Sequence, residues 1–474
     1  MSESSQTLPV EFVTSVKSAL GPKGWSEDQD EIQPYLEDWR GNYKGFSSLL
    51  VKPASTEEVA AVLKLCDEYS VAITPQGGNT SLVNGGIPYG EVILSLKRLN
   101  RIRSTDPLNN SIVAEVGCVL TSIHDNALEH DRFFPLSLGS QGTATIGGLI
   151  STNAGGVAVL RYGMMRDLLL GLEVVTAEGE IWNGLRGLRK DNTGYDLKHL
   201  FAGAEGTLGI VTAASLKLFP VPKTATAWLT LETVEDAVEL LSLIRSKVGD
   251  TVTSFELMRK PGVELACEEI DTCRDPLPSP SQWRVLVEIS MSDEALAAQA
   301  LESALEAAFE RELITDGAIA TSLSQAEDFW TIRESLPLVK RGFMNSVNHD
   351  VSVPVSRIAE FIDKSESLLK REIGEIEVFV FGHLGDGNLH YAVAEPAKTE
   401  KPIVRERAGE ITNLVHGLIA EFDGSISAEH GIGLMQRDDL LNYKSPLEID
   451  LMRSIKRALD PKNILNPGRI FPLD

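Results

Sequence analysis

Two glycine-rich segments constrain the fold of this chain most strongly, because each interrupts strand-like sequence with backbone that must bend sharply. They read PQGGNTS at 75–81 and PLSLGS at 135–140, the second continuing through TIGGLISTNAGG at 145–156. Glycine lets the backbone approach a ligand and turn N–H groups toward it, while Ser, Thr and Asn add further donors. Such a lining suits a pyrophosphate without any lysine. Neither segment matches the Rossmann or P-loop glycine pattern, and tight turns without a ligand remain the alternative for either segment alone.

Length and charge limit the domain count and the partners of the chain. Its 474 residues are too many for one ordinary core and predict two or three domains. A formal net charge of −24 argues against nucleic acid and anionic membranes, which attract basic surfaces. The four cysteines form no CxxC pair, which favours reduced thiols and a cytoplasmic location. No apolar run approaches the roughly 18 residues of a spanning helix, so we expect no transmembrane segment.

The pattern of helices and strands predicts an α+β fold with two domains and a C-terminal segment. From 40 to 220, short strands and a helix that begins at the capping box of Ser55 and Glu58 surround the glycine-rich segments. From 221 to 430, strands alternate with long helices, which predicts a sheet with helices packed on it, α+β or α/β. Of these two classes we expect α+β, with an antiparallel sheet covered by helices. We expect the segment 431–474 to return to the first domain.

A third segment, GHLGDGNLH at 382–390, places two histidines seven residues apart around an Asp-Gly dipeptide. Asp-Gly is a preferred type I′ hairpin turn. A two-residue loop there would pair His383 with His390 on one face of the hairpin, with Cβ atoms roughly 4.5–5.5 Å apart. Two imidazoles placed in this way can bind one metal ion.

A third metal ligand is expected from SAEHGIG at 427–433, which carries Glu429 and His430. Two imidazoles and one carboxylate leave an open coordination position, as in catalytic zinc sites, and Zn, Mn or Co each suit these ligands. Isolated histidines are most often structural, which is our expectation for His124, His130, His199 and His416.

The glycine-rich segments, with EGTLGIVT at 205–212 and NPGR at 466–469, resemble the FAD-binding domain of the vanillyl-alcohol oxidase or PCMH type. In many relatives a histidine near the first loop carries the flavin covalently, whereas this chain has Asn79 there. The resemblance therefore implies non-covalent FAD. The residues expected to bind it are Pro75, Gln76, Gly77, Gly78, Asn79, Thr80, Ser81, Pro135, Gly139, Ser140, Gly147, Gly148, Ser151, Asn153, Gly155, Glu205, Gly209, Ile210 and Asn466.

The segments GHLGDGNLH and SAEHGIG are similar to motifs of the FAD-linked D-2-hydroxyacid dehydrogenases, which include D-2-hydroxyglutarate dehydrogenase, D-lactate dehydrogenase and the glycolate oxidase flavoprotein subunit. The resemblance implies a divalent metal, most often zinc, on His383, His390 and Glu429. It also implies that His430 is the catalytic base.

Arg333, in the segment FWTIRESLP, resembles a family arginine that binds a substrate carboxylate. An anionic substrate of so acidic a protein needs such a local cation. A surface ion pair with Glu334 or Asp328 is the alternative for this residue.

The activity implied is the oxidation of a D-2-hydroxy acid, such as D-2-hydroxyglutarate or D-lactate, to the 2-oxo acid. The substrate hydroxyl and carboxylate would bind the metal, His430 would remove the hydroxyl proton, and hydride would pass to flavin N5. We expect a quinone or an electron-transfer flavoprotein as electron acceptor, and a homodimer as the assembly.

Three positions depart from the pattern of the D-2-hydroxyglutarate dehydrogenases, which carry Thr, Lys and Asn where this chain has Pro337, Asn348 and Ala392. We expect Asn348 to contact the substrate, but loss of the lysine removes a carboxylate partner. D-2-hydroxyglutarate, a monocarboxylate and a bulkier D-2-hydroxy acid therefore stay open. Two other functions also stay open, namely a non-redox flavoenzyme of the alkyl-dihydroxyacetone-phosphate synthase type and a flavin electron-transfer subunit.

Overall fold

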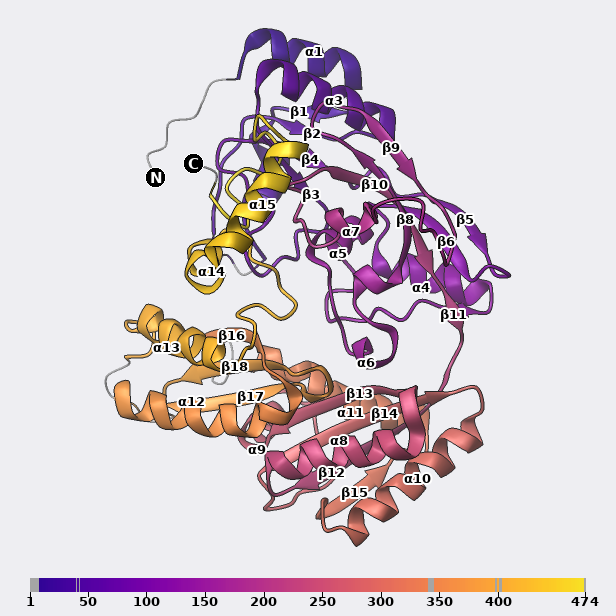
Figure 1. Ribbon diagram of the computed structural model, residues 1–474, viewed down its shortest axis with the longest axis vertical. Helices are drawn as coiled ribbons and strands as arrows, with labels where there is room; N and C mark the ends of the chain where they lie inside the picture. The colour runs from indigo at the N-terminus through magenta and orange to yellow at the C-terminus, as the bar shows by residue number, and fades with distance from the viewer. Residues whose placement is uncertain are drawn as a thin grey trace. The chain divides into compact units, whose positions relative to one another are not determined.

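The computed structural model describes residues 8–39, 41, 43–339, 345–396, 399 and 403–472 (Figure 1). It divides the chain into two compact units, and each is described by itself. The first unit comprises residues 1–156, 163–221 and 429–474, and the second comprises 157–162 and 222–428. Residue 40, where the sequence places the start of the first domain, lies outside the described residues.

The first unit contains a four-stranded sheet of order β1-β2-β4-β3, in which β2 and β3 both run parallel to β4. Its strands are β1 (Trp25–Ser26), β2 (Leu50–Val51), β3 (Ile73–Gln76) and β4 (Val92–Ser95). Three helices accompany them, α1 (Val10–Leu20), α2 (Gln29–Ile32) and α3 (Thr56–Tyr69). The predicted capping helix is α3, because the Ser55 hydroxyl accepts the Glu58 N–H at 3.2 Å.

A second sheet of the first unit is antiparallel and has the order β5-β6-β10-β8-β9. Its strands are β5 (Ile102–Asp106), β6 (Ser111–Glu115), β8 (Leu169–Val175), β9 (Ile181–Gly184) and β10 (Ile210–Lys217). A short two-stranded sheet joins β7 (Arg132–Phe133) to β11 (Phe219–Pro220). The helices between these strands are α4 (Leu120–Glu129), α5 (Ile146–Thr152) and α7 (Lys198–Phe201).

The second unit is built on one seven-stranded sheet of order β15-β12-β14-β13-β17-β18-β16, in which every neighbouring pair is antiparallel. Its strands are β12 (Lys223–Leu231), β13 (Val252–Arg259), β14 (Trp283–Met291), β15 (Asp316–Ile319), β16 (Val347–Ser352), β17 (Glu377–His383) and β18 (Asn388–Ala394). This architecture confirms the predicted α+β class and the antiparallel sheet with covering helices.

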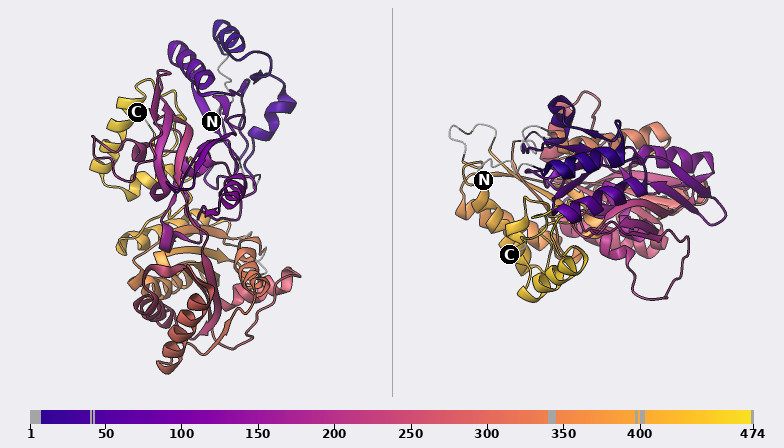
Figure 2. Two further views of the ribbon diagram at one scale, coloured as in Figure 1. Left: turned by 90° about the vertical axis from the view of Figure 1, so that its right-hand side faces the viewer. Right: turned by 90° about the horizontal axis from the view of Figure 1, so that it is seen from above.

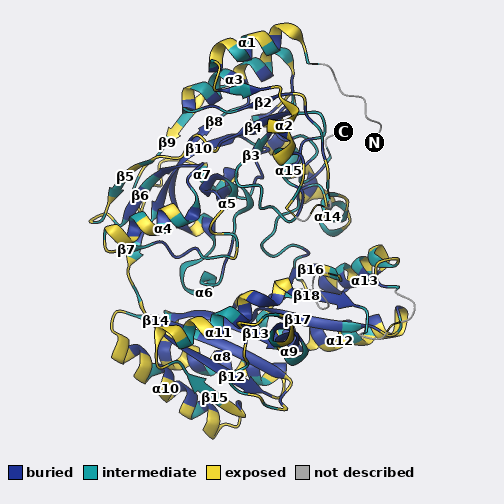
Figure 3. Ribbon diagram, turned by 180° about the vertical axis from the view of Figure 1, so that it is seen from behind, coloured by how far each residue is buried: buried dark blue, intermediate teal, exposed yellow. Residues whose placement is uncertain are grey.

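Helices cover both faces of this sheet, and the central strands are almost wholly buried (Figure 3). The helices of the unit are α6 (Val159–Tyr162), α8 (Val234–Val248), α9 (Lys260–Glu269), α10 (Glu294–Glu310), α11 (Leu323–Ser335), α12 (Ile358–Glu372) and α13 (Ala408–Glu421). One apolar cluster joins α9 and α11 to Trp228, Leu286 and Phe381. Strand alternation puts His383, His390 and Glu256 on the face of the sheet that carries this cluster.

The C-terminal segment belongs to the first unit, with α14 (Arg437–Tyr443) and α15 (Pro446–Leu459). Drawn in yellow, it lies beside the purple strands of that unit in Figures 1 and 2. Lys456 on α15 fixes it, because its ammonium donates to Thr207 O (2.8 Å), Leu465 O (2.9 Å) and Asp460 Oδ2 (2.5 Å). Within the part of the chain that the structure describes, no helix is long and apolar enough to span a membrane.

Candidate active site: a glycine-lined cradle and a histidine cluster

The first glycine-rich segment lies directly against the second. A Cβ atom on Gly77 would lie 2.2 Å from Thr145 Oγ1, and one on Gly78 would lie 2.2 Å from Thr143 O. Real Cβ atoms do not approach other atoms so closely, so only glycine allows this contact. The two segments that the sequence singled out therefore form one structure.

Polar side chains brace the first loop. Gln76 donates from Nε2 to Gly86 O (2.8 Å), and the Ser81 hydroxyl accepts backbone N–H groups of the same loop. Asn79 has a left-handed backbone with φ 57° and donates from Nδ2 to Glu37 O (2.9 Å). The asparagine at position 79 thus supports a turn, a role to which its side chain is suited.

The second segment is partly helical, a feature that its glycine-rich sequence did not predict. Residues Ile146–Thr152 form α5. Gly147 lies within this helix, and a side chain does not fit at this position because a Cβ there would be 2.8 Å from Val116 Cβ. A Cβ on Gly148 would meet only Thr145 Oγ1, at 3.7 Å, so this position faces open space. Asn153 ends the helix with φ 51°, and its Oδ1 accepts the Arg166 N–H at 2.8 Å.

Glu205 and Asn466 join these segments to the C-terminal part of the first unit. Asn466 donates from Nδ2 to Glu205 O at 2.7 Å. The Glu205 carboxylate accepts the N–H groups of Ile432 (2.7 Å) and Gly433 (2.8 Å). Burial raises the Glu205 pKa to about 7, even though these N–H groups and Arg469 favour the ionised form. The Glu205 side chain, predicted to bind the cofactor, therefore makes its hydrogen bonds to the turn that follows His430.

The other predicted cofactor residues take varied places in the same unit. Gly139 and Ser140 lie in the turns before α5, where Ser140 O accepts the N–H groups of Thr143 and Ala144. Gly209 and Ile210 are buried at the start of β10, and a Cβ on Gly209 would be 2.7 Å from Val174 Cγ1. Gly209 has no side chain, and Ile210 is 1 % exposed. The remaining members lie along the two segments, namely Pro75, Thr80, Pro135, Ser151 and Gly155.

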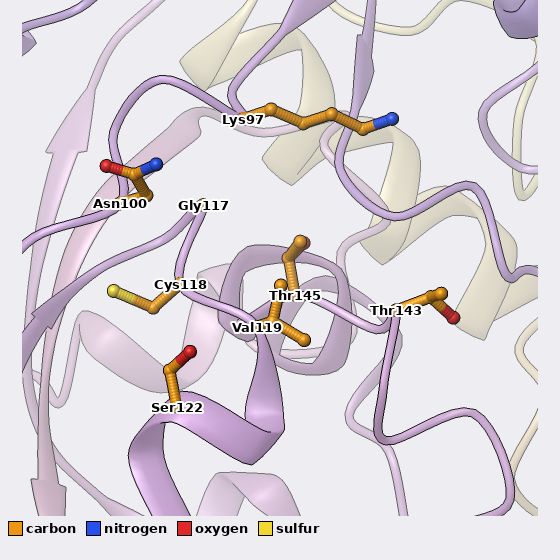
Figure 4. Close-up of a pocket in the computed structure, with 8 residues that line it drawn as sticks. All are labelled: Lys97, Asn100, Gly117, Cys118, Val119, Ser122, Thr143 and Thr145. Carbon is orange, nitrogen blue, oxygen red and sulfur yellow. The ribbon is translucent and has the colours of Figure 1, made fainter. Parts of the chain in front are cut away.

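A cavity of about 260 Å³ adjoins the cradle (Figure 4). Sequence reasoning missed its lining, because only Thr145 stands in a quoted glycine-rich segment. The lining residues are Lys97, Asn100, Gly117, Cys118, Val119, Ser122, Thr143 and Thr145. Among the described residues, the buried Gln76 Oε1, Thr145 Oγ1 and Asn466 Oδ1 have no hydrogen-bond partner. Buried polar atoms of native proteins are normally satisfied, so a polar ligand such as FAD fits this cradle.

In the second unit, the histidine hairpin differs from the predicted type I′ turn. Strand β17 pairs Phe381, not His383, with His390. The turn is a short 3₁₀ segment, Leu384–Asp386, followed by Gly387 with φ 88°. The register differs because the connection is longer than the predicted two-residue loop, with a 3₁₀ turn before Gly387. On the other edge of β17, His383 lies opposite Glu256 of β13. The two histidines still share a face, and their ring centroids are 5.7 Å apart.

Around His383 lies a buried group that links a strand pair to a helix. The Glu256 carboxylate accepts His383 Nδ1–H at 2.7 Å and Arg333 Nε–H at 2.6 Å. Burial alone would raise the Glu256 pKa, but the charges and hydrogen bonds of His383 and Arg333 lower it to about 2. The guanidinium of Arg333 also stacks on the Phe381 ring, 4.5 Å from its centroid.

Arg333 is 6 % exposed, so the alternative of a surface ion pair is wrong for this residue. It projects from the last turn of α11 into the face of the sheet that carries the histidines. Its immediate partner, Glu256, carries no sequence motif, and only the fold reveals their pairing.

Asp350 is a second residue that the sequence did not single out. It lies directly opposite His390 across the β16–β18 pair, with 4.0 Å between Asp350 Oδ1 and His390 Nδ1. Asn388 Nδ2 donates to the same carboxylate oxygen at 2.8 Å. The exposed Asn348 lies opposite Ala392 on the same face, so two of the positions that depart from the family pattern face each other.

The segment of Glu429 and His430 belongs to the first unit. His430 Nε2 lies 3.5 Å from Glu429 Oε1, and both side chains are partly exposed. The Glu205 carboxylate fixes the glycine turn directly after them.

The isolated histidines make structural contacts, as expected. His124 Nε2 lies 2.8 Å from Leu136 O, and burial lowers the pKa of this histidine. His130 Nδ1 lies 2.8 Å from Asn126 O, and His199 lies beside Asp196. The His416 ring packs edge-on against another histidine, His349.

Comparison with known proteins identifies the two units. The model of an FAD binding domain matches residues 47–184, and that of the FAD linked oxidase C-terminal domain matches 222–470. The structure of p-cresol methylhydroxylase aligns with a TM-score of 0.76 at 20 % identity, covering 98 % of this chain and 96 % of the other. The matched family model thus defines an FAD-binding protein, and its fold is of the vanillyl-alcohol oxidase type.

Sequence relatives narrow the class further. The probable mitochondrial D-2-hydroxyglutarate dehydrogenase of Oryza sativa subsp. indica is 40 % identical over 464 residues, which cover 97 % of this chain and 81 % of the relative. The chain belongs to the FAD-linked D-2-hydroxyacid dehydrogenase family and is accordingly an FAD-dependent oxidoreductase. Alkyldihydroxyacetonephosphate synthase aligns with a TM-score of 0.72 at 18 % identity, covering 97 % of this chain and 85 % of that one. That likeness concerns the fold alone and gives no support to the non-redox alternative.

Proposed function

We propose that this chain oxidises a D-2-hydroxy acid to the 2-oxo acid, with D-2-hydroxyglutarate as the first substrate to test. One observation carries the proposal, namely the buried group in which Glu256 binds both His383 and Arg333 beside His390. A cation and imidazoles on one face of a sheet suit a substrate that carries a carboxylate and a neighbouring hydroxyl. The curated relatives, 34–40 % identical over nearly the full chain, are named for D-2-hydroxyglutarate.

His383, His390 and Glu429 are the proposed ligands of a divalent metal, and we propose zinc because imidazole and carboxylate ligands suit it. The contacts of His383 support this assignment. The proton on Nδ1 faces Glu256, so Nε2 carries the lone pair and is the ligand atom. Asp350 adds a carboxylate next to His390. This donor set of imidazoles and carboxylates fits a catalytic metal ion with an open position.

The remaining residues divide the work on the substrate. Arg333 binds the α-carboxylate, Asn348 contacts the rest of the substrate, and His430 accepts the hydroxyl proton on its imidazole. When bound, FAD would accept a hydride at N5 and the metal would polarise the hydroxyl. The positions of Asn79 and its turn support non-covalent FAD.

Further parts of the proposal concern the partners of the enzyme. We propose a quinone or an electron-transfer flavoprotein as the electron acceptor, a homodimer as the assembly and the cytoplasm as the location. A cross-strand pair of Asn348 and Ala392 in place of Lys and Asn leaves less charge for a second carboxylate, so D-lactate belongs in the same substrate panel.

The test is a steady-state assay with an artificial electron acceptor and a panel of D- and L-2-hydroxy acids. The expected result is formation of the 2-oxo acid from one or more D-acids, at least tenfold faster than from their L-enantiomers. Turnover of none of the acids by protein that carries FAD would contradict the proposal.

A further inference from the structure

One buried carboxylate connects the two halves of the proposed substrate site. Glu256 lies on β13, the strand next to β17, directly opposite His383. It is 1 % exposed, and it faces α11 together with the apolar cluster of that side of the sheet. A carboxylate in such a place is costly unless its partners are well arranged.

Both oxygens of this carboxylate are used, each by a different element. Oε1 accepts the Nδ1–H of His383 on β17 at 2.7 Å, and Oε2 accepts the Nε–H of Arg333 on α11 at 2.6 Å. The donors stand 127 and 77 residues away in the sequence. The carboxylate therefore sets the position of two side chains whose backbones are independent.

We propose that Glu256 is a positioning residue of the dehydrogenase site, where one carboxylate fixes the imidazole of His383 and the guanidinium of Arg333 at the same time. The inference rests on the proposed function, in which His383 binds the metal and Arg333 binds the substrate carboxylate. In that function, Glu256 itself contacts neither the metal nor the substrate carboxylate.

For His383, the contact decides which ring nitrogen carries the proton. A histidine that ligates a metal through one nitrogen normally donates the N–H of the other nitrogen to a carboxylate or carbonyl, which fixes both tautomer and ring orientation. Glu256 takes the Nδ1 proton, so Nε2 offers its lone pair. The Nη2 group of Arg333 lies 3.4 Å from that Nε2, in agreement with an acceptor at this atom.

For Arg333, the contact fixes the plane of the guanidinium. Its Nε–H is held by Glu256, and its flat face lies on the Phe381 ring, 4.5 Å from the centroid. The fork of the guanidinium thus has one defined orientation, which is what bidentate carboxylate binding requires.

A purely structural ion pair is the alternative, and the chain supplies a matched control for it. Glu288 is a largely buried carboxylate on the neighbouring strand β14, on the same face of the sheet. It accepts Trp330 Nε1–H at 3.1 Å, also from α11, and the Thr226 hydroxyl at 3.1 Å. None of these partners belongs to the proposed site.

The decisive substitution is Glu256→Gln, because an amide cannot accept from both donors. If its oxygen faces Arg333, its NH₂ group meets His383 Nδ1 and drives the proton to the metal-facing nitrogen. If the amide is turned round, its NH₂ group faces the Arg333 Nε–H, and both of these groups are donors. Glu256→Asp keeps the charge and both acceptor oxygens on a shorter stem, and serves as the conservative rescue if the Gln variant does not fold.

The experiment measures zinc affinity and kinetics on FAD-loaded full-length protein. Metal is first removed, and Zn²⁺ is then titrated against a competing chelator for wild type, Glu256→Gln, Glu256→Asp and Glu288→Gln. We expect Glu256→Gln to weaken Zn²⁺ binding roughly 10–100-fold and to raise KM for the 2-hydroxy acid, as loss of an outer-shell partner does. Glu256→Asp should lie between it and wild type, and Glu288→Gln should keep both values within about twofold of wild type while its Tm falls.

The outcomes separate this inference from the function on which it rests. Wild-type protein that binds Zn²⁺ and oxidises a D-acid, with Glu256→Gln and Glu256→Asp equal to it in both affinity and KM, overturns the positioning role alone. Equal changes of Zn²⁺ affinity and KM in the Glu256 and Glu288 variants also overturn the positioning role alone, because the effect is then structural. Wild-type protein that binds no metal overturns both the positioning role and the metal ligands of the proposed function.

Discussion

Gly387 shows how one residue shapes the histidine hairpin. Its φ of 88° lies in the left-handed region, and a Cβ there would be 2.2 Å from the backbone oxygen of Val353. Because the nearest atom belongs to backbone, a side chain at 387 can be relieved only by moving the turn. Asp386 completes that turn by accepting the Asn388 N–H at 3.1 Å.

Gly387→Ala should therefore destabilise the protein by about 2 kcal/mol or more, a Tm loss of roughly 4–8 °C. Thermal unfolding of the FAD-loaded protein measures it. Gly409→Ala is the control, since this glycine lies in α13 and a Cβ there meets nothing within 4 Å. The control should be neutral or gain up to about 1 kcal/mol. Equal Tm values for the two variants would contradict the account of the turn.

Glu205 is a buried acid whose titration should appear in the stability of the protein. Its pKa is raised by burial from 4.5 to about 7, so the folded state holds a proton that the unfolded state releases at lower pH. Stability contributed by this group is thus fully present below pH 4.5 and is lost as pH rises to about 7, by about 3 kcal/mol at most.

Glu205→Gln should remove this loss, so that the difference in Tm between wild type and variant changes in the variant's favour between pH 5 and pH 8. Scans across that range measure it. Glu310→Gln, a change at an exposed acid of α10, should show no such trend. A Tm difference between wild type and Glu205→Gln that stays constant with pH would contradict the raised pKa.

At the scale of elements, helix α11 presents Arg333 to the sheet. Arg333→Lys keeps a positive charge but loses the planar fork that can bind Glu256 and a substrate carboxylate together. We expect KM for the D-2-hydroxy acid to rise roughly 10–100-fold, the equivalent of one charge-assisted hydrogen bond.

Arg284→Lys is the matched control for Arg333→Lys. Arg284 is likewise buried on the same face of the sheet, but it pairs with Asp275 at 3.1 Å. Steady-state kinetics should show an unchanged KM for this variant, with a lower Tm. If both variants raise KM equally, the effect does not come from substrate binding by Arg333.

The elements that the sequence predicted well are those with local signals. The capping box at Ser55, for example, depends on two residues that stand three positions apart. The register of the histidine hairpin was wrong because the Asp386-Gly387 signal predicts a two-residue loop, whereas the structure has a longer connection with a 3₁₀ turn at Leu384–Asp386. The helix α5 was missed because its glycines are poor helix formers, and packing against Val116 outweighs their propensity.

The candidate site was predictable only in its motif residues. His383, His390 and Arg333 stand in recognisable segments and meet on one face of the sheet. Glu256 and Asp350 carry no such signal, because each reaches the site through strand pairing with residues far away in the sequence. The cavity lining around Cys118 was missed because, apart from Thr145, its residues stand outside the glycine-rich segments.

At the scale of the whole molecule, the chain leaves the first unit at residue 221 and returns to it at residue 429. Asn466 and the partners of the Glu205 carboxylate all stand in the returning segment. A chain ended after residue 428 therefore lacks part of the cradle, and it should retain less than a tenth of the FAD of the full chain. The ratio of flavin to protein absorbance measures this, and full retention would contradict the assignment of the cradle.

In the proposed function, flavin, metal and D-2-hydroxy acid act together in one protein. The most direct test is an anaerobic visible spectrum of the FAD-loaded protein before and after addition of D-2-hydroxyglutarate and D-lactate. We predict bleaching of the flavin band by a D-acid and not by its L-enantiomer, loss of bleaching after metal removal, and its return with added Zn²⁺. A flavin band that no hydroxy acid bleaches, or bleaching that metal removal leaves unchanged, would contradict the proposed function.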